Sequence, residues 1–235
     1  MVELKQNAYA QSQSSAIDAG LREYMMKVYN YMTSGLAISG LVAWGFSKSP
    51  ALMGAIYGTA LQWVVMLAPL GFIFFLGARL QKMSLSAAQM TFWAFAAVMG
   101  MSLSYIFIVF TGVSIVRVFL ITCSTFAAMS IYGYTTKRDL TKLGSFLMMG
   151  LIGIIIASLV NIFMKSSMMY FVISILGVLI FVGLTAYDTQ KIKNMYAVSD
   201  TGEVMGKKAV MGALTLYLDF INLFIMLLRL FGQRR

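Results

Sequence analysis

Residues 209–228 read AVMGALTLYLDFINLFIMLL, an apolar run that carries a single charged side chain, Asp219. About 20 apolar residues are enough to cross the hydrocarbon core of a bilayer as a helix. A carboxylate inside that core is costly, so it usually faces a bundle interior or a water-filled cavity and marks an ion or proton path. This stretch therefore predicts a membrane-spanning helix with a functional carboxyl group in its middle.

Further apolar segments of similar length precede this run. They cover residues 28–46, 54–78, 86–110, 118–134, 143–164 and 168–188. We therefore predict an all-α polytopic membrane protein with seven transmembrane helices. Residues 24–232 form its single membrane domain, and residues 1–23, rich in Gln, Ser and Ala, form a mobile cytoplasmic tail.

The composition of the chain supports this class and excludes others. Hydrophobic residues make up 60% of the 235 positions and charged residues only 11%, whereas a soluble domain averages about a quarter charged residues. The net charge is +10, but the basic residues stand singly or in pairs between apolar runs, which indicates topology and no nucleic-acid partner. The chain has no histidine and only Cys123, which excludes histidine proton relays, most transition-metal sites and an internal disulfide.

The distribution of Lys and Arg predicts the orientation of the chain. Cytoplasmic loops carry an excess of these residues. With seven spans and a cytoplasmic N-terminus, twice as many of them fall inside as outside. Arg229, Arg234 and Arg235 would also prefer the inside, so charge favours a re-entrant seventh segment, while its length and apolar character favour a span.

Polar residues form a stripe along the last apolar segment. Thr215, Asp219 and Asn222 are spaced four and three residues apart, so they share one face of a helix. Such a helix belongs at the centre of a bundle. The structural alternative is a hydrogen-bonded cluster that locks helix packing, which suits Thr215 and Asn222 better than Asp219, because a neutral residue would do that work at lower cost.

A second carboxylate closes the preceding apolar segment. Asp188 lies in GLTAYDTQKIK, residues 183–193. Taken alone, it is either an interfacial residue paired with Lys191 or part of a site with Asp219. If the two carboxyls meet, they cannot both stay ionised and must share a proton, which makes them a pH sensor. Because Asp188 ends its segment and Asp219 lies mid-segment, they meet only if the sixth helix is set deeper than its apolar length indicates.

Arg79 ends the second apolar segment and is also expected on the cytoplasmic side. It would pair with one of the carboxylates as an electrostatic latch, or serve only as an interfacial residue that sets topology.

The two aspartate motifs carry a family resemblance. GLTAYDTQK at 183–191 and LYLDFINLF at 216–224, together with YGYTTKRDL at 132–140, resemble the Bax inhibitor-1 family, also called the transmembrane Bax inhibitor motif family, in its bacterial branch. The resemblance covers residues 22–232. It implies a bacterial inner-membrane protein whose last helix is central and wrapped by the other six, with Asp188 and Asp219 as the aspartyl pair of a pH-sensitive calcium leak. Arg79 matches the latching arginine of the second helix by position.

Several functions follow from these residues. The leading one is a proton-gated cation leak in which Asp188 and Asp219 bind calcium weakly and transiently, with no other cofactor. The alternative is a regulator of a membrane-anchored quality-control protease that acts through the N-terminal tail. An intramembrane aspartyl protease is disfavoured because Leu-Tyr-Leu at 216–218 stands where such enzymes carry glycines, so we expect no enzyme activity. A structural role for both carboxylates, without flux, is also open.

Overall fold

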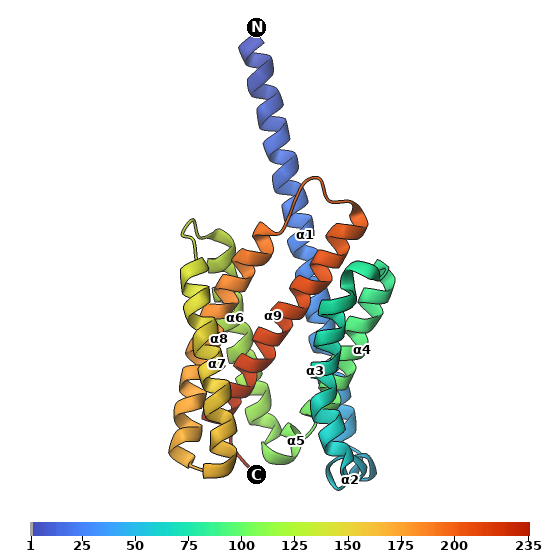
Figure 1. The fold of residues 1–235 in the computed structure, drawn as a ribbon, viewed down its shortest axis with the longest axis vertical. Helices are drawn as coiled ribbons and strands as arrows, with labels where there is room; N and C mark the ends of the chain where they lie inside the picture. The colour runs from blue at the N-terminus through green and yellow to red at the C-terminus, as the bar shows by residue number, and fades with distance from the viewer. Residues whose placement is uncertain (1) are drawn as a thin grey trace.

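The computed structural model describes the backbone of residues 2–235 and the side chains of residues 17–235. The described chain is built from helices, as predicted (Figure 1). In chain order they are α1 (Val2–Ser47), α2 (Pro50–Tyr57), α3 (Leu61–Arg79), the 3-10 turn η1 (Leu80–Lys82), α4 (Leu85–Leu103), α5 (Ile106–Val109), α6 (Gly112–Thr135), α7 (Thr141–Met164), α8 (Ser167–Asn194) and α9 (Gly202–Phe231).

Hydroxyl caps explain where many of these helices begin. A Ser or Thr side chain accepts a hydrogen bond from a backbone N–H of the first turn, which would otherwise lack a partner. This arrangement starts α2, α4, α6, α8 and α9, at Ser49, Ser84, Thr111, Ser166 and Thr201.

Six stretches of the described chain are long and apolar enough to cross a membrane. They are Leu61–Lys82, Leu85–Val109, Gly112–Thr135, Thr141–Met164, Ser167–Asn194 and Gly202–Phe231. Segment 28–46, the first of the seven predicted spans, lies within α1 and is not among the six, so the predicted number of spans is not confirmed. Segment 54–78 is interrupted at residues 58–60, between α2 and α3.

The predicted boundary between the last two segments is wrong. The connection expected at 189–208 is helical over most of its length, because α8 continues to Asn194 and α9 begins at Gly202. The true loop is held by an ion pair of 2.7 Å between Lys208 Nζ and Asp200 Oδ2. Charged residues ended the apolar runs in the sequence, but a helix continues through such residues once it leaves the apolar layer.

The last helix, α9, is the most buried of the long helices. In its most apolar stretch 72% of the residues are buried, against 39% or less in the other five candidate spans. It packs against α8, α1, α6 and α4 and runs obliquely from one end of the bundle to the other (Figure 1). Since α9 is one continuous helix of 30 residues, the seventh segment has the form of a span and does not turn back as a re-entrant loop.

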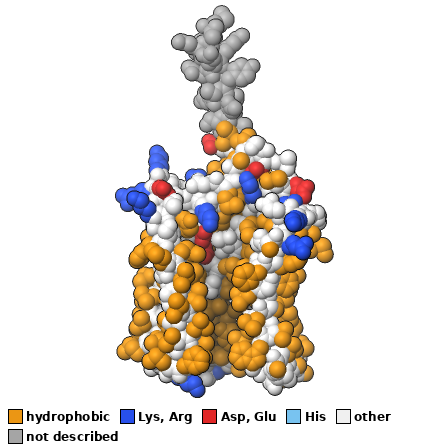
Figure 2. All heavy atoms as spheres, viewed as in Figure 1, with side chains coloured by type: hydrophobic (Ala, Val, Ile, Leu, Met, Phe, Trp, Pro, Cys, Tyr) orange, Lys and Arg blue, Asp and Glu red, His pale blue; other side chains and the backbone are white. Residues whose placement is uncertain are grey.

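Apolar and charged side chains occupy separate zones of the surface. Figure 2 shows a broad apolar belt, with charges gathered at the end of the bundle near the loop between α8 and α9 and fewer at the opposite end. Such a belt requires an apolar solvent around it, which is the expected environment of a membrane domain.

The predicted tail, residues 1–23, falls partly outside the described residues. Met1 and the side chains of residues 2–16 are not described. The backbone from Val2 belongs to α1, and the mobility and cytoplasmic position of the tail stay predictions.

Candidate functional site

Asp188 of α8 and Asp219 of α9 meet inside the bundle. Their side chains are 8% and 5% exposed, and the two carboxyl groups lie within hydrogen-bonding reach of each other. Oδ2 of Asp219 is fully buried and has no donor among the described residues. Two carboxylates offer only acceptors, so a hydrogen bond between them requires a proton on one.

Close helix packing fixes the position of Asp188. Gly133 of α6 faces the backbone of Ala186, and Gly144 of α7 faces the ring of Tyr187. A Cβ atom at either glycine would collide with these groups, so the absence of side chains allows α6 and α7 to approach α8 immediately before the aspartate. Thr189, the next residue, donates a hydrogen bond of 3.4 Å to Ser130 Oγ of α6.

Both aspartates lie within long helices and not at a helix end. Asp188 does not end its helix, because α8 continues to Asn194. Asp219 lies well inside α9, which crosses the bundle obliquely (Figure 1). The helix that carries Asp188 is therefore longer than the apolar run that predicted it.

The ion pair expected from the interfacial alternative for Asp188 does not form among the described residues. In the described part of the chain Asp188 forms no ion pair with Lys191, whose Nζ instead lies 5.9 Å from the centre of the Tyr187 ring. Lys193 Nζ turns toward α6, where it donates a hydrogen bond of 2.8 Å to the backbone oxygen of Tyr134. Neither lysine forms an ion pair with the two carboxyls among the described residues, although the charge of Lys191 lies near enough to act on Asp188.

The other two residues of the predicted stripe are satisfied within their own helix. Thr215 Oγ1 donates to the carbonyl of Met211 at 3.1 Å, and Asn222 Nδ2 donates to the carbonyl of Leu218 at 2.8 Å. Both residues are half-buried. They flank Asp219 along α9 but form no hydrogen bond to it, so the structure brings together only the two aspartates.

Arg79 is not part of this site. It ends α3, its side chain is exposed, and no ion pair involves it among the described residues. The physical reason is its helix, because α3 packs mainly against α4 and not against α8 or α9. The latch role of Arg79 stays a prediction.

The pair offers few ligands for a metal ion. No group of three or more His, Cys, Asp or Glu side chains suited to one metal occurs in the described residues. Two carboxyl groups provide hard oxygen ligands of the kind calcium prefers, but fewer than the six to eight oxygens of a tight site. The arrangement is suited to holding a proton, or a cation briefly.

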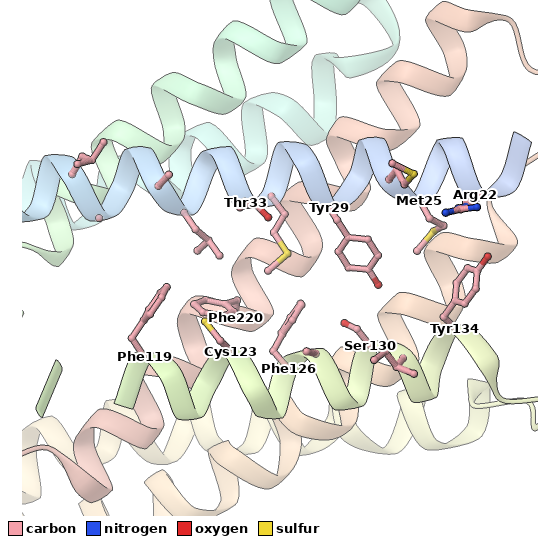
Figure 3. A pocket seen from close by; sticks show the side chains of 18 residues that line it. Arg22, Met25, Tyr29, Thr33, Phe119, Cys123, Phe126, Ser130, Tyr134 and Phe220 are labelled. Atoms are coloured by element: carbon pink, nitrogen blue, oxygen red, sulfur yellow. The ribbon is translucent and has the colours of Figure 1, made fainter. Parts of the chain in front are cut away.

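A groove between α1 and α6, which was not predicted from the sequence, lies beside the site. Its volume is about 1150 Å³, and Figure 3 shows Phe119, Cys123, Phe126 and Ser130 of α6 facing α1 across it. These four residues recur at spacings of four and three, which is the available sequence signal. Phe220 of α9 also lines the groove. Ser130 is shared between the groove and the hydrogen bond from Thr189.

Comparisons with known proteins show the family to which the chain belongs. The family model of the inhibitor of apoptosis-promoting Bax1 (Bax1-I) matches residues 21–235. The inner membrane protein YbhL of Escherichia coli K12 is 48% identical over 92% of this chain and 94% of its own length. The uncharacterized protein RP147 of Rickettsia prowazekii is 47% identical over the full length of both chains. The chain is thus a membrane protein that belongs to the Bax inhibitor family, Bax1-I.

Proposed function

We propose that this protein is a pH-sensitive leak for calcium or another cation across a bacterial inner membrane, gated by Asp188 and Asp219. The observation that carries this proposal is Oδ2 of Asp219, fully buried without a donor and within reach of a second carboxyl group. Buried polar groups normally have partners. A site that is satisfied only when it holds a proton or a cation is suited to gating.

The proposed gate has two states. With one proton shared, the carboxyls are bridged and carry one negative charge between them, so α8 and α9 stay together. When that proton leaves, two like charges repel at close range in a medium of low dielectric constant, and the helices separate or a cation enters. The proton and the cation therefore compete for the same oxygens.

The proposed topology completes this arrangement. Segment 28–46 of α1 supplies a seventh span, α9 lies at the centre of the other six, and the N-terminus is cytoplasmic. Packing of α1 against both α4 and α9 supports this arrangement. Asn222, three residues from Asp219, would supply a further oxygen to a passing calcium ion. Arg79 would act as a latch only in a state in which α3 has moved toward the pair.

Calcium flux into proteoliposomes tests the gate. Full-length wild type, Asp219→Asn and Asp188→Asn are reconstituted separately and assayed over a series of pH values with a trapped calcium indicator. Asp139→Asn is the matched control, because it makes the same change of charge at an exposed residue in the loop before α7. We expect a pH-dependent flux in the wild type and the control, and a pH-independent flux in both site variants. Absence of calcium flux in the wild type at every pH would contradict the proposed leak.

The second candidate function is regulation of a membrane-anchored quality-control protease. The feature that favours it is the start of α1, which extends beyond the end of the bundle (Figure 1). Deleting residues 1–16 separates the two functions. A leak keeps its pH-dependent flux after the deletion, whereas a regulator loses its partner in a membrane pull-down. If the flux is lost when residues 1–16 are deleted, the result would count against a leak that works independently of this segment.

A further inference from the structure

Basic side chains gather around a second cavity, which is lined by neither Asp188 nor Asp219. The cavity has a volume of about 520 Å³ and lies where α7 ends, α8 begins and the chain terminates. Lys165, Arg229 and Arg234 line it, and no acidic side chain does among the described residues. The cavity therefore concentrates positive charge at one place on the end of the bundle that carries the C-terminus (Figure 1).

No acidic side chain in the connections at this end neutralises these charges. Residues 47–60, 104–111, 165–166 and 232–235, which connect or end the helices there, contain no Asp or Glu. The ion pairs of the described chain all involve other lysines. Three cations around one cavity repel one another unless an anion lies between them.

Two of the cations are held in place by an aromatic ring. The guanidinium carbons of Arg229 and Arg234 lie 5.1 and 5.9 Å from the centre of the Tyr170 ring. Stacking on a ring fixes a guanidinium group while leaving its N–H groups free to bind. The planar fork of an arginine matches the oxygens of a phosphate group.

The backbone that carries Arg234 is also fixed. Residues 233–235 run alongside the turn between α5 and α6. The N–H of Thr111 donates to the carbonyl of Gln233 at 2.9 Å, and the N–H of Arg235 donates to the carbonyl of Val109 at 3.0 Å. The C-terminal segment is therefore ordered before any ligand binds, which lowers the entropic cost of binding.

The turn between α7 and α8 supplies the remaining donors. Lys165 ends α7 with φ of 50°, a left-handed conformation that is uncommon for residues other than glycine. Asn161 supports this turn, because its Oδ1 accepts a hydrogen bond of 3.0 Å from the N–H of Ser166. The turn brings Lys165 to the cavity beside the N-terminus of α8, where free backbone N–H groups favour an anion.

We propose that this cavity binds a phosphate-bearing anion, with the phosphodiester headgroup of an anionic lipid as its ligand. Its wall includes Ile162 of α7, whose side chain is 63% exposed and continues the apolar surface of that helix. A phosphate with an attached acyl chain therefore meets both charge and apolar surface at this position. Free phosphate shares the charge but gains nothing from the apolar surface.

Lipid binding to the purified full-length protein tests the proposal. Native mass spectrometry from a neutral detergent gives the apparent affinities for phosphatidylglycerol and phosphatidylcholine, and inorganic phosphate is added as a competitor. We expect tighter binding of phosphatidylglycerol, weakened about tenfold by Arg234→Gln or Lys165→Gln, as for loss of a charge-assisted hydrogen bond. Both side chains are exposed, so neither change removes a core contact. Arg229→Gln is made only after the first two variants.

The matched control is Arg117→Gln. Arg117 is exposed in the first turns of α6 and does not line the cavity, so its loss removes the same charge without removing a ligand. Competition by millimolar inorganic phosphate would assign the site to a soluble phosphate instead of a lipid. Equal binding of the two lipids by the wild type, or equal weakening by Arg117→Gln and Arg234→Gln, would overturn the proposal.

Discussion

Two buried polar contacts of α9 lie two residues apart and are built in opposite ways. Tyr217 faces α1 and α4, where its hydroxyl lies 2.6 Å from Ser39 Oγ, and Ser39 in turn donates to the carbonyl of Ala96 at 2.6 Å. Asp219 faces α8, where its Oδ2 finds no donor among the described residues. The first contact is complete with neutral groups, whereas the second is complete only with an added proton or cation.

Under the proposed function, this difference separates packing from gating. The rings of Phe92 and Phe95 meet the Tyr217 ring edge-on at 6.2 and 5.3 Å, and every polar group there has a neutral partner. Such a contact stabilises the bundle equally at every pH. In the proposed gate the aspartate pair depends on its protonation, which makes it the place where pH would change the packing of α8 against α9.

The largest effect is expected from a substitution at Asp219 that removes the difference between the two contacts. Asp219→Asn gives the pair a neutral amide donor, so its stability should not fall as pH rises. The wild type should fall by about 3–5 kcal/mol between acidic and alkaline buffer, as for a buried charge left without compensation. Unfolding in detergent at the two pH values measures the stability of the wild type and of the variant. An equal decline of the two proteins with pH would show that the pair does not control stability.

A smaller effect is expected from the glycine beside the pair. Gly133→Val places side-chain atoms against the backbone of Ala186 and should cost about 1–3 kcal/mol, as overpacking usually does. It should also alter the pH dependence of the calcium flux, because α6 is displaced from α8. Gly153→Val is the control, since a Cβ there meets nothing within 4 Å. Similar losses in both variants would mean that helix propensity, and not the contact, sets the cost.

The neutral contact gives the third prediction. Tyr217→Phe keeps the ring and removes one hydrogen bond, so it should cost about 0.5–1.5 kcal/mol. The loss should be the same in acidic and alkaline buffer. Tyr132→Phe, at an exposed position of α6, should cost nothing measurable. A loss for Tyr217→Phe that changes with pH would contradict the division between the two contacts.

The smallest effect is expected at Asp139, a carboxylate that accepts hydrogen bonds from neighbouring donors. The hydroxyl and backbone N–H of Thr141 lie 2.6 and 2.9 Å from Asp139 Oδ1 and lower the pKa of this exposed group below its usual value. A lowered folded-state pKa contributes stability above the unfolded pKa, which is lost as pH falls through the folded value. Carboxyl NMR should show the low pKa, and Thr141→Val should raise it toward normal. An unchanged pKa in that variant would remove the hydroxyl as the cause.

The sequence predicted the elements of this protein better than their ends. The apolar run at 143–164 lies within two residues of the bounds of α7, because hydropathy depends on local composition. The predicted segments ended six residues before the end of α8 and began seven residues after the start of α9, since a helix does not end where its apolar stretch ends. The stripe of Thr215, Asp219 and Asn222 was only partly informative, because two of its members bond to their own backbone.

The sequence by itself determined the class of the protein, its family and the two carboxyl groups that have no place in lipid. Only the tertiary structure decided that Asp188 and Asp219 meet, that Arg79 lies apart from them, and that Lys165, Arg229 and Arg234 surround one cavity. The physical reason is that composition and spacing act along one helix, whereas contact depends on how helices tilt and how closely they approach. Glycines such as Gly133 set that approach, and their partners lie far away in the sequence.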